Sequence, residues 1–327
     1  MKGKHHVIIE TNRLKYEFDI KRNITVIQGD SATGKTTLVD LLEEYSSKGK
    51  NRGIIVESDV NCEVFSGQED RWEYTLDGIK DSIVIIDEDY HFVFTKEFAE
   101  YLQGSSNYYV IITRKPLKNL PYSVNEIYGI RTSGKYHFPE QVYHEFYPLY
   151  DQDTYSTLDS KVMFLIEDKE AGYQFFCDVA GKDACISAEG NAKIYQNMIS
   201  LSAENSLLVI ADGAAFGAYI NNIVKYRELK KHIALYFPES FEWMILKSNV
   251  LDDHEINEIL KHPENYIDSS EYISWERFFT SLLIDKTQND KIKGYSKTKL
   301  TEFYTSGKNA SAILNVMPEY IRRLIDK

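Results

Sequence analysis

One contiguous stretch near the start of the sequence has the residue types that bind a polyphosphate. It reads, in order, Gly29, Asp30, Ser31, Ala32, Thr33, Gly34, Lys35, Thr36 and Thr37. The spacing Gly-x-x-x-x-Gly-Lys-Thr predicts a loop whose successive backbone N–H groups curl around phosphates. Lys35 would reach the β and γ phosphates, and the Thr36 hydroxyl would ligate the Mg²⁺ that bridges them. Residues 29–36, here called the phosphate loop, therefore predict binding of a nucleoside triphosphate with Mg²⁺.

Two carboxylates follow a short apolar run further along the chain. Residues 83–86 read as a buried strand, and Asp87 and Glu88 come directly after it. This pattern resembles the Walker B motif of nucleotide-binding proteins. The resemblance implies that Asp87 holds Mg²⁺ through water and that Glu88 accepts a proton from the attacking water. A pair of exposed acids at a strand end is the alternative.

These side chains need regular elements to bring them together. Residues 24–28 have the apolar character of a strand covered on both faces, and apolar residues recur at helical spacing from Leu38 to Tyr45. Further predicted elements are a hairpin over residues 7–10 and 14–20, strands at 54–56, 83–86 and 109–112, and a helix over 95–102. Strands that alternate with helices predict an α/β fold with a parallel sheet.

Together these features resemble the additional-strand, catalytic-glutamate division of P-loop ATPases, to which AAA and STAND proteins belong, over residues 20–131. The resemblance implies ATP and Mg²⁺ as ligands, a catalytic role for Lys35 beside Glu88, and a sensor of the γ-phosphate at Thr113 and Arg114. The sequence contains no Asn-Lys-x-Asp motif, which favours ATP over GTP. Residues 65–69 also resemble the ABC signature, but residues 70–81 lack the helical pattern expected after it. No arginine finger is assigned. Its candidates are Arg52, Arg114 and Arg131, and any of them could act across an interface in a homo-oligomer.

A second alternating series follows an irregular stretch. Strands are predicted at residues 162–166, 184–187, 207–210 and 233–237, and their carboxyl ends carry Glu167, Asp168, Glu189, Asp212, Glu239 and Glu242. Carboxylates that meet at one edge of a parallel sheet could hold Mg²⁺, which prefers oxygen ligands. The alternative is that these acids cap helices or lie near the positive ends of helix dipoles.

Residues 164–168 and 209–214 resemble the strand-end motifs of Toprim domains, which OLD-family nucleases couple to an ATPase. The resemblance implies that Glu167 and Asp212 bind a metal for phosphodiester chemistry. Ala214 stands where a second aspartate is expected, so a remnant of a metal site is the alternative to an active nuclease.

The predicted organisation has three parts: a P-loop NTPase domain over residues 1–155, a smaller Toprim-like α/β domain over 160–250, and a helical C-terminal segment over 251–327. A net charge of −12, spread evenly along the chain, opposes nonspecific binding of nucleic acid, although a local groove or a protein partner stays open. No apolar run reaches the roughly 18 residues of a membrane span, and the basic start lacks the core of a signal peptide. We therefore expect a cytoplasmic protein without a membrane partner.

The leading hypothesis is an ATPase whose nucleotide state controls the second domain. A setting in phage defence or nucleic-acid processing rests on the OLD-like resemblance alone. The alternatives are a Mg²⁺-dependent nuclease that uses Glu167 and Asp212, a kinase in which Asp59 activates an acceptor hydroxyl, and a regulatory protein that binds ATP without turnover.

Overall fold

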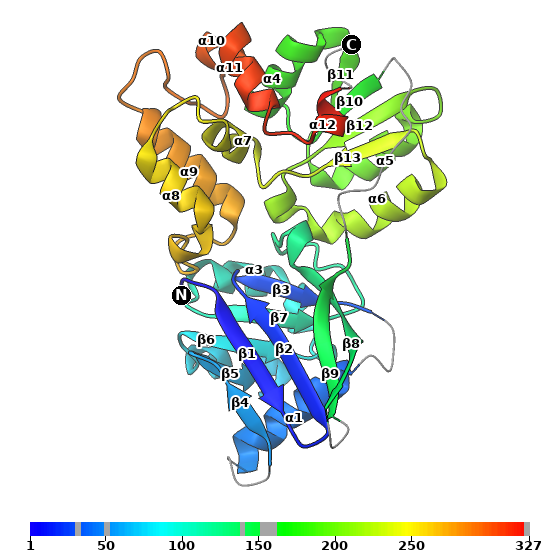
Figure 1. Cartoon of the computed structure of the whole chain (residues 1–327), viewed down its shortest axis with the longest axis vertical. Coiled ribbons are helices and arrows are strands. Elements are labelled where there is room, and N and C mark those ends of the chain that lie inside the picture. The colour runs from blue at the N-terminus through cyan, green and yellow to red at the C-terminus, as the bar shows by residue number, and fades with distance from the viewer. Residues whose placement is uncertain (30–33, 49–52, 138–140, 151–161, 324–327) are drawn as a thin grey trace. The chain divides into compact units, whose positions relative to one another are not determined.

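The computed structural model describes residues 1–29, 34–48, 53–137, 141–150 and 162–323. The fold is α/β and forms two compact units (Figure 1). The first unit contains Met1–Tyr150 and His262–Ser274, and the second contains Asp151–Lys261 and Trp275–Lys327. The sequence pattern did not indicate that residues 262–274 return to the first unit.

The first unit is built on a nine-stranded mixed sheet, in the order β4-β1-β2-β9-β8-β3-β7-β6-β5. Its parallel part consists of β8 (Ile127–His137), β3 (Ile24–Ile27), β7 (Tyr108–Ile112), β6 (Ser82–Ile86) and β5 (Asn61–Val64). Every residue of β3, β6 and β7 is buried. Their apolar sequences fit this position, because an inner parallel strand is covered on both faces.

The remaining strands join the sheet mainly through antiparallel pairs. β1 (His5–Glu10) and β2 (Leu14–Ile20) make the predicted hairpin. β9 (Gln141–Pro148) pairs parallel with β2 and antiparallel with β8. The strand predicted at residues 54–56 exists as β4 (Ile55–Glu57), but it pairs antiparallel with β1 at the edge of the sheet.

Helices of the first unit cover the sheet and complete its core. α1 (Lys35–Lys48) follows the phosphate loop and buries Leu38, Val39 and Leu42 in the same core as strands β1, β2, β6 and β7. The other helices are α2 (Trp72–Asp77), α3 (Lys96–Tyr101) and the 3₁₀ turns η2 (Glu69–Arg71), η3 (Phe92–Phe94), η4 (Leu102–Gly104), η5 (Val124–Glu126) and η8 (Pro263–Asn265). The expectation that residues 70–81 lack a helix was wrong, because Trp72 and Leu76 lie one turn apart and are both buried.

Residues 262–274 are held to the first unit by polar contacts. The Met1 ammonium group donates to Asp268 Oδ1 at 3.0 Å, and Asn23 Nδ2 donates to the carbonyl oxygens of Ser269 and Tyr272 at 3.2 and 2.9 Å. These partners are more than 240 positions apart in the chain, so no local pattern could have indicated them.

The second unit contains a four-stranded parallel sheet, in the order β11-β10-β12-β13. Its strands are β10 (Val162–Ile166), β11 (Cys185–Ser187), β12 (Ser206–Ile210) and β13 (Ile233–Tyr236). Its helices are α4 (Ala171–Ala180), η6 (Lys182–Ala184), α5 (Asn191–Leu201), η7 (Gly213–Ala215), α6 (Gly217–Leu229), α7 (Phe241–Lys247), α8 (His254–Lys261), α9 (Trp275–Thr287), α10 (Glu302–Thr305), α11 (Gly307–Leu314) and α12 (Glu319–Arg322). The predicted second parallel sheet is therefore confirmed.

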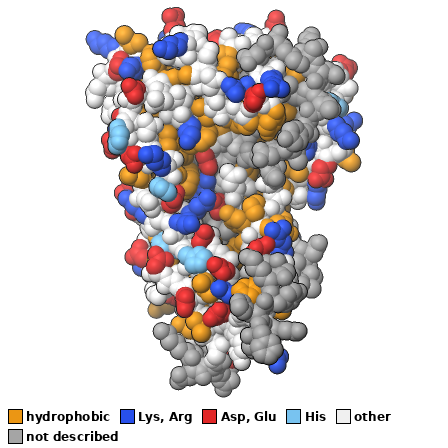
Figure 2. Space-filling view, in the orientation of Figure 1, with side chains coloured by type: hydrophobic (Ala, Val, Ile, Leu, Met, Phe, Trp, Pro, Cys, Tyr) orange, Lys and Arg blue, Asp and Glu red, His pale blue; other side chains and the backbone are white. Residues whose placement is uncertain are grey.

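The surface carries no extended patch of one charge on the face shown in Figure 2, where acidic and basic side chains are interspersed. Within the described ranges, no helix combines the length and the apolar character needed to cross a bilayer.

Candidate functional site

The described ends of the phosphate loop have the backbone that its glycines were expected to provide. Gly29 has φ +137° and Gly34 has φ +98°, a region that side chains disfavour. A β-carbon at Gly34 would also lie 2.8 Å from Tyr16 Oη, so this position lacks space for any side chain. The middle of the loop, formed by Asp30, Ser31, Ala32 and Thr33, lies outside the described residues.

Lys35 connects the two ends of the loop. α1 begins at this residue, and its buried Nζ donates to the Gly29 carbonyl oxygen at 2.8 Å. Thr36 is exposed and Thr37 half-buried in the same first turn. The first N–H groups of a helix have no intrahelical acceptor, and they favour anions together with the helix dipole. The Lys35 ammonium group and the N-terminus of α1 thus both lie at the phosphate loop.

Strand order brings the other predicted residues to the same edge of the sheet. β7 lies between β3 and β6, and all three strands are parallel. Their carboxyl ends therefore carry the phosphate loop, the segment with Thr113 and Arg114, and the pair Asp87 and Glu88, in that order. The N–H of Thr113 donates to the Ile27 carbonyl oxygen at 3.1 Å, which places Thr113 beside the start of the loop.

Asp87 is half-buried at the end of β6. Its Oδ1 accepts the backbone N–H of Glu88 at 2.8 Å. Burial raises the pKa of Asp87, and the neighbouring carboxylates of Asp89, Glu88 and Asp40 raise it further. Asp40 belongs to the second turn of α1, so negative charge from two elements gathers here. A Mg²⁺ ion held by Thr36 and Asp87 would offset this charge and would take its other ligands from phosphate and water.

Glu88 and Arg114 form a two-bond ion pair. Arg114 Nε donates to Glu88 Oε2 at 2.9 Å, and Arg114 Nη2 donates to Glu88 Oε1 at 3.0 Å. Both carboxylate oxygens therefore already accept hydrogen bonds. The buried Thr113 hydroxyl donates to the Lys115 carbonyl oxygen at 3.1 Å and accepts the Lys115 N–H at 3.0 Å. Arg114, one of the two predicted sensor residues, is thus paired with Glu88, the predicted base.

Two other predicted residues of the first unit lie elsewhere. Asp59 precedes β5, so it lies at the amino ends of the parallel strands, opposite the phosphate loop. It is paired with His5 Nδ1 at 2.9 Å. This position does not fit the kinase hypothesis, because an activating carboxylate must lie near the transferred phosphate. Arg131 pairs with Glu145 at 2.9 Å, and Arg52 lies outside the described residues.

In the second unit the structure brings Glu167 and Asp212 together. They follow the neighbouring strands β10 and β12, and the Asp212 N–H donates to Glu167 Oε2 at 3.2 Å. Asp212 Oδ1 accepts the Phe241 N–H, at the start of α7, at 3.1 Å. Burial raises the pKa of Glu167 to about 7 and also raises that of Asp212, to which the charges of Glu276 and Glu167 contribute.

Tyr295, Lys297 and Glu276 also lie at this place and were not predicted from the sequence, whereas Glu242 was among the predicted strand-end acids. Tyr295 Oη donates to the buried Glu242 Oε1 at 2.7 Å, and Lys297 Nζ donates to Glu276 Oε1 at 3.0 Å. Burial opposes the charged form of Lys297, but the carboxylates of Glu276, Glu242 and Asp212 outweigh it and raise its pKa. We call Glu167, Asp212, Glu242 and Glu276 the carboxylate cluster. Glu242 follows β13 closely on α7, as its position in the sequence indicated, whereas Glu276 comes from α9, which no spacing in the sequence links to the strand ends.

The cluster does not have the arrangement of a metal site. Among the residues that the structure describes, no three or more His, Cys, Asp or Glu side chains are placed to hold a metal ion. Asp168 caps α4, because its Oδ1 accepts the N–H groups of Tyr173 and Glu170 at 2.9 and 3.3 Å. Ala214 adds no carboxylate. For Asp168 the capping alternative is therefore the correct one.

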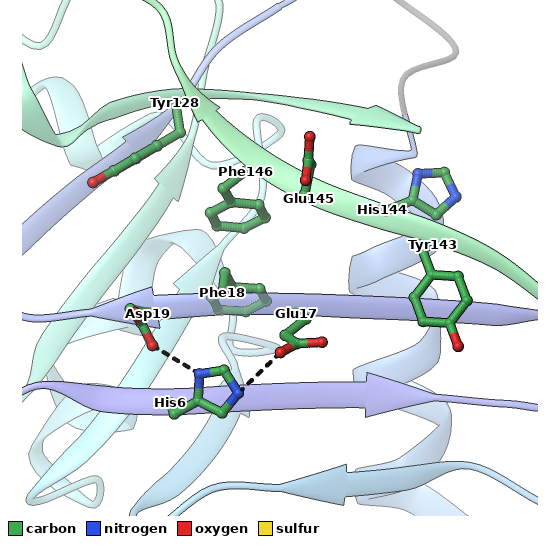
Figure 3. Close-up of a pocket in the computed structure, with 9 residues that line it drawn as sticks. All are labelled: His6, Glu17, Phe18, Asp19, Tyr128, Tyr143, His144, Glu145 and Phe146. Carbon is green, nitrogen blue, oxygen red and sulfur yellow. Dashed lines mark hydrogen bonds and ion pairs between the residues drawn. The ribbon is translucent and has the colours of Figure 1, made fainter. Parts of the chain in front are cut away.

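A separate pocket of about 440 Å³ lies between the diverging strands β2 and β9 (Figure 3). Its carboxylates are already paired: Asp19 with His6 at 2.7 Å, Glu17 with Lys15 at 3.1 Å, and Glu145 with Arg131 at 2.9 Å. Figure 3 shows His6 between Asp19 and Glu17. Each of these three carboxylates therefore already has a basic side chain as its partner.

Comparisons with known proteins found no match to the chain among family models, curated proteins or solved structures. Function must therefore be inferred from the side chains themselves.

Proposed function

We propose that the first unit binds ATP with Mg²⁺ and hydrolyses it. The observation that carries this proposal is the position of Lys35. Its ammonium group lies 2.8 Å from the Gly29 carbonyl oxygen, across the phosphate loop and at the first residue of α1. A polyphosphate would replace that carbonyl oxygen as the partner of Lys35 and would accept hydrogen bonds from the first N–H groups of the helix, which have no intrahelical acceptor.

The order of the strands supports the resemblance to the additional-strand division of P-loop ATPases. In that division one strand separates the strand before the phosphate loop from the strand that ends in the acidic pair. Here β7 lies between β3 and β6. In this arrangement the attacking water would lie between the γ-phosphate and Glu88.

Catalysis by this unit would divide among a few side chains. Thr36 and Asp87 would hold Mg²⁺, which would supply polarisation of the terminal phosphate. Lys35 balances the charge of the phosphates, and Glu88 takes the proton from the attacking water. Glu88 can do so only after its ion pair with Arg114 opens, because both of its oxygens accept Arg114 N–H groups.

Binding and turnover can be tested separately. Titration with a fluorescent ATP analogue is expected to show saturable binding that Lys35→Ala abolishes and that Lys118→Ala, a change of an exposed lysine, leaves intact. Phosphate release is expected to fall by about 10²-fold or more in Glu88→Gln, the size of a general-base contribution, while binding is retained. Absence of binding by the wild type would refute the proposal. Competition with GTP tests the preference for ATP.

A second candidate, ATP binding without turnover, is favoured by the Glu88–Arg114 pair itself. Tight binding with negligible phosphate release, equal in the wild type and in Glu88→Gln, would favour this regulatory function over hydrolysis.

For the second unit we propose a Toprim-like module whose state depends on the nucleotide. The meeting of Glu167 and Asp212 supports the resemblance, whereas the arrangement of the carboxylate cluster does not support a nuclease that uses Mg²⁺. Incubation with DNA and RNA in Mg²⁺ or Mn²⁺ tests this. Cleavage that is lost in Glu167→Gln would restore the nuclease hypothesis and make nucleic acid the partner.

A further inference from the structure

A tyrosine on β2 contacts the end of the phosphate loop. Tyr16 Oη donates to the Gly34 carbonyl oxygen at 2.9 Å. The same oxygen accepts the N–H of Leu38 at 3.0 Å, which is the first hydrogen bond of α1. The Gly34 carbonyl is therefore held from the helix and from the sheet at once.

This contact sets the direction of a neighbouring N–H group. The Gly34 carbonyl and the Lys35 N–H belong to one peptide unit, which is planar and trans, so they point in opposite directions. Fixing the carbonyl toward Tyr16 turns the Lys35 N–H away from the sheet. That N–H is among the first of α1, which have no intrahelical acceptor and would face a phosphate.

The Tyr16 ring is held by His144, its register partner on β9. The two rings stack with centroids 4.6 Å apart and planes 11° apart. A β-carbon at Gly34 would lie 2.8 Å from Tyr16 Oη and 3.3 Å from the His144 ring, so the pair closes directly on the loop. His144 Nδ1 is buried and has no hydrogen-bond partner among the described residues, which makes stacking the main contribution of this ring.

The Tyr16 hydroxyl can donate its hydrogen bond to Gly34 at any pH near neutrality. Thr37, on the first turn of α1, hydrogen bonds to it as well. Burial raises the pKa of Tyr16 to about 12, so the hydroxyl keeps the proton that it donates. Burial also lowers the pKa of His144, so its ring is neutral near pH 7 and brings no charge to the loop.

We propose that Tyr16 and His144 are positioning residues of the phosphate loop: the Tyr16 hydroxyl orients the Gly34–Lys35 peptide for phosphate, and the His144 ring holds Tyr16 in place. The inference rests on the proposed ATP site and adds residues from outside the loop and its helix. Because β9 ends at Pro148, shortly before the chain first leaves this unit after Tyr150, the stack also joins the loop to the last strand before that exit.

The test is the affinity for a fluorescent ATP analogue, measured beside the melting temperature without nucleotide. Tyr16→Phe keeps the stacked ring and removes only the hydroxyl. Its Kd is expected to rise about 2- to 12-fold, the effect of one hydrogen bond, with the KM for hydrolysis rising in parallel. The matched control is Tyr143→Phe. It also removes a hydroxyl, but Tyr143 is the residue before His144 on β9, and its side chain therefore points to the other face of the sheet.

His144 is tested by a pair of substitutions. His144→Phe retains a ring that can stack and is expected to bind nearly as the wild type does, whereas His144→Ala is expected to weaken binding as Tyr16→Phe does. Equal affinities of Tyr16→Phe and the wild type, with binding still lost in Lys35→Ala, would overturn the inference and leave the ATP site standing. Equal weakening by both His144 variants would overturn the role of the stack. If the wild type binds no ATP analogue, the proposed function fails first.

Discussion

Arg114 is ion-paired with Glu88, the proposed catalytic base. Removing the Arg114 side chain should change the rate of hydrolysis, and the direction of that change should identify the role of Arg114. The Glu88 and Arg114 side chains are 35% and 56% exposed. Exposed ion pairs contribute about 0.2–1 kcal/mol, and the two-bond geometry favours the upper part of that range. Opening this pair is therefore expected to cost at most about 1 kcal/mol, which corresponds to about a fivefold change in rate. We predict that Arg114→Ala raises phosphate release by about two- to fivefold at saturating ATP.

The assay is steady-state phosphate release at several ATP concentrations, so that kcat and KM are obtained separately. Arg131→Ala is a matched control, because Arg131 pairs at the same 2.9 Å and with similar exposure, 59% and 38%, with Glu145, which is not the proposed base. A fall of tenfold or more in Arg114→Ala would refute this reasoning. It would mean that Arg114 stabilises charge on the γ-phosphate, as the sensor resemblance implies, because loss of an arginine that contacts the transferred phosphate costs about 10³-fold or more.

Two predictions concern the carboxylate cluster of the second unit. Lys297→Met leaves Glu276 without its ammonium partner and is expected to lower the free energy of unfolding by about 1–3 kcal/mol, between the values for exposed and buried ion pairs. Lys193→Met, which removes a fully exposed pair with Glu189, should change it little, and equal stability of both variants would contradict a structural role for Lys297. Glu167 has a folded pKa of about 7 against an ordinary value of 4.5, so the folded state binds the extra proton and stability from this group is lost as pH rises from about 4.5 to 7. Denaturant unfolding at pH 5 and pH 7.5 should therefore show a smaller loss of stability for Glu167→Gln than for the wild type, and an unchanged pH dependence would show that Glu167 does not titrate in this window.

The strands that carry the candidate site could be predicted because their signals are local. β3, β6 and β7 are short, largely apolar runs, and such runs indicate buried strands whatever their neighbours are. β5 was missed because it carries no such local signal. As an edge strand it exposes Asn61 and only partly buries Cys62 and Glu63, so its composition carries no sign of burial.

The phosphate loop is also a local feature, since its glycines, lysine and threonines are consecutive. Periodicity placed β4 correctly as a strand, but it could not assign the partner. Pairing depends on which edge is available in the folded sheet, and β4 pairs with β1 instead of joining the parallel strands.

Contacts between distant segments were decided by tertiary structure alone. Glu88 meets Arg114 because β7 is inserted beside β6, and Tyr16 meets His144 because β2 pairs with a strand more than 120 positions later. Lys297 meets Glu276 for the same reason, through the packing of a loop against α9. By itself the sequence determined which side chains could bind a phosphate and which runs form buried strands. It could not determine which side chains restrain, orient or neutralise one another, because those contacts depend on strand order and packing, which no local period specifies.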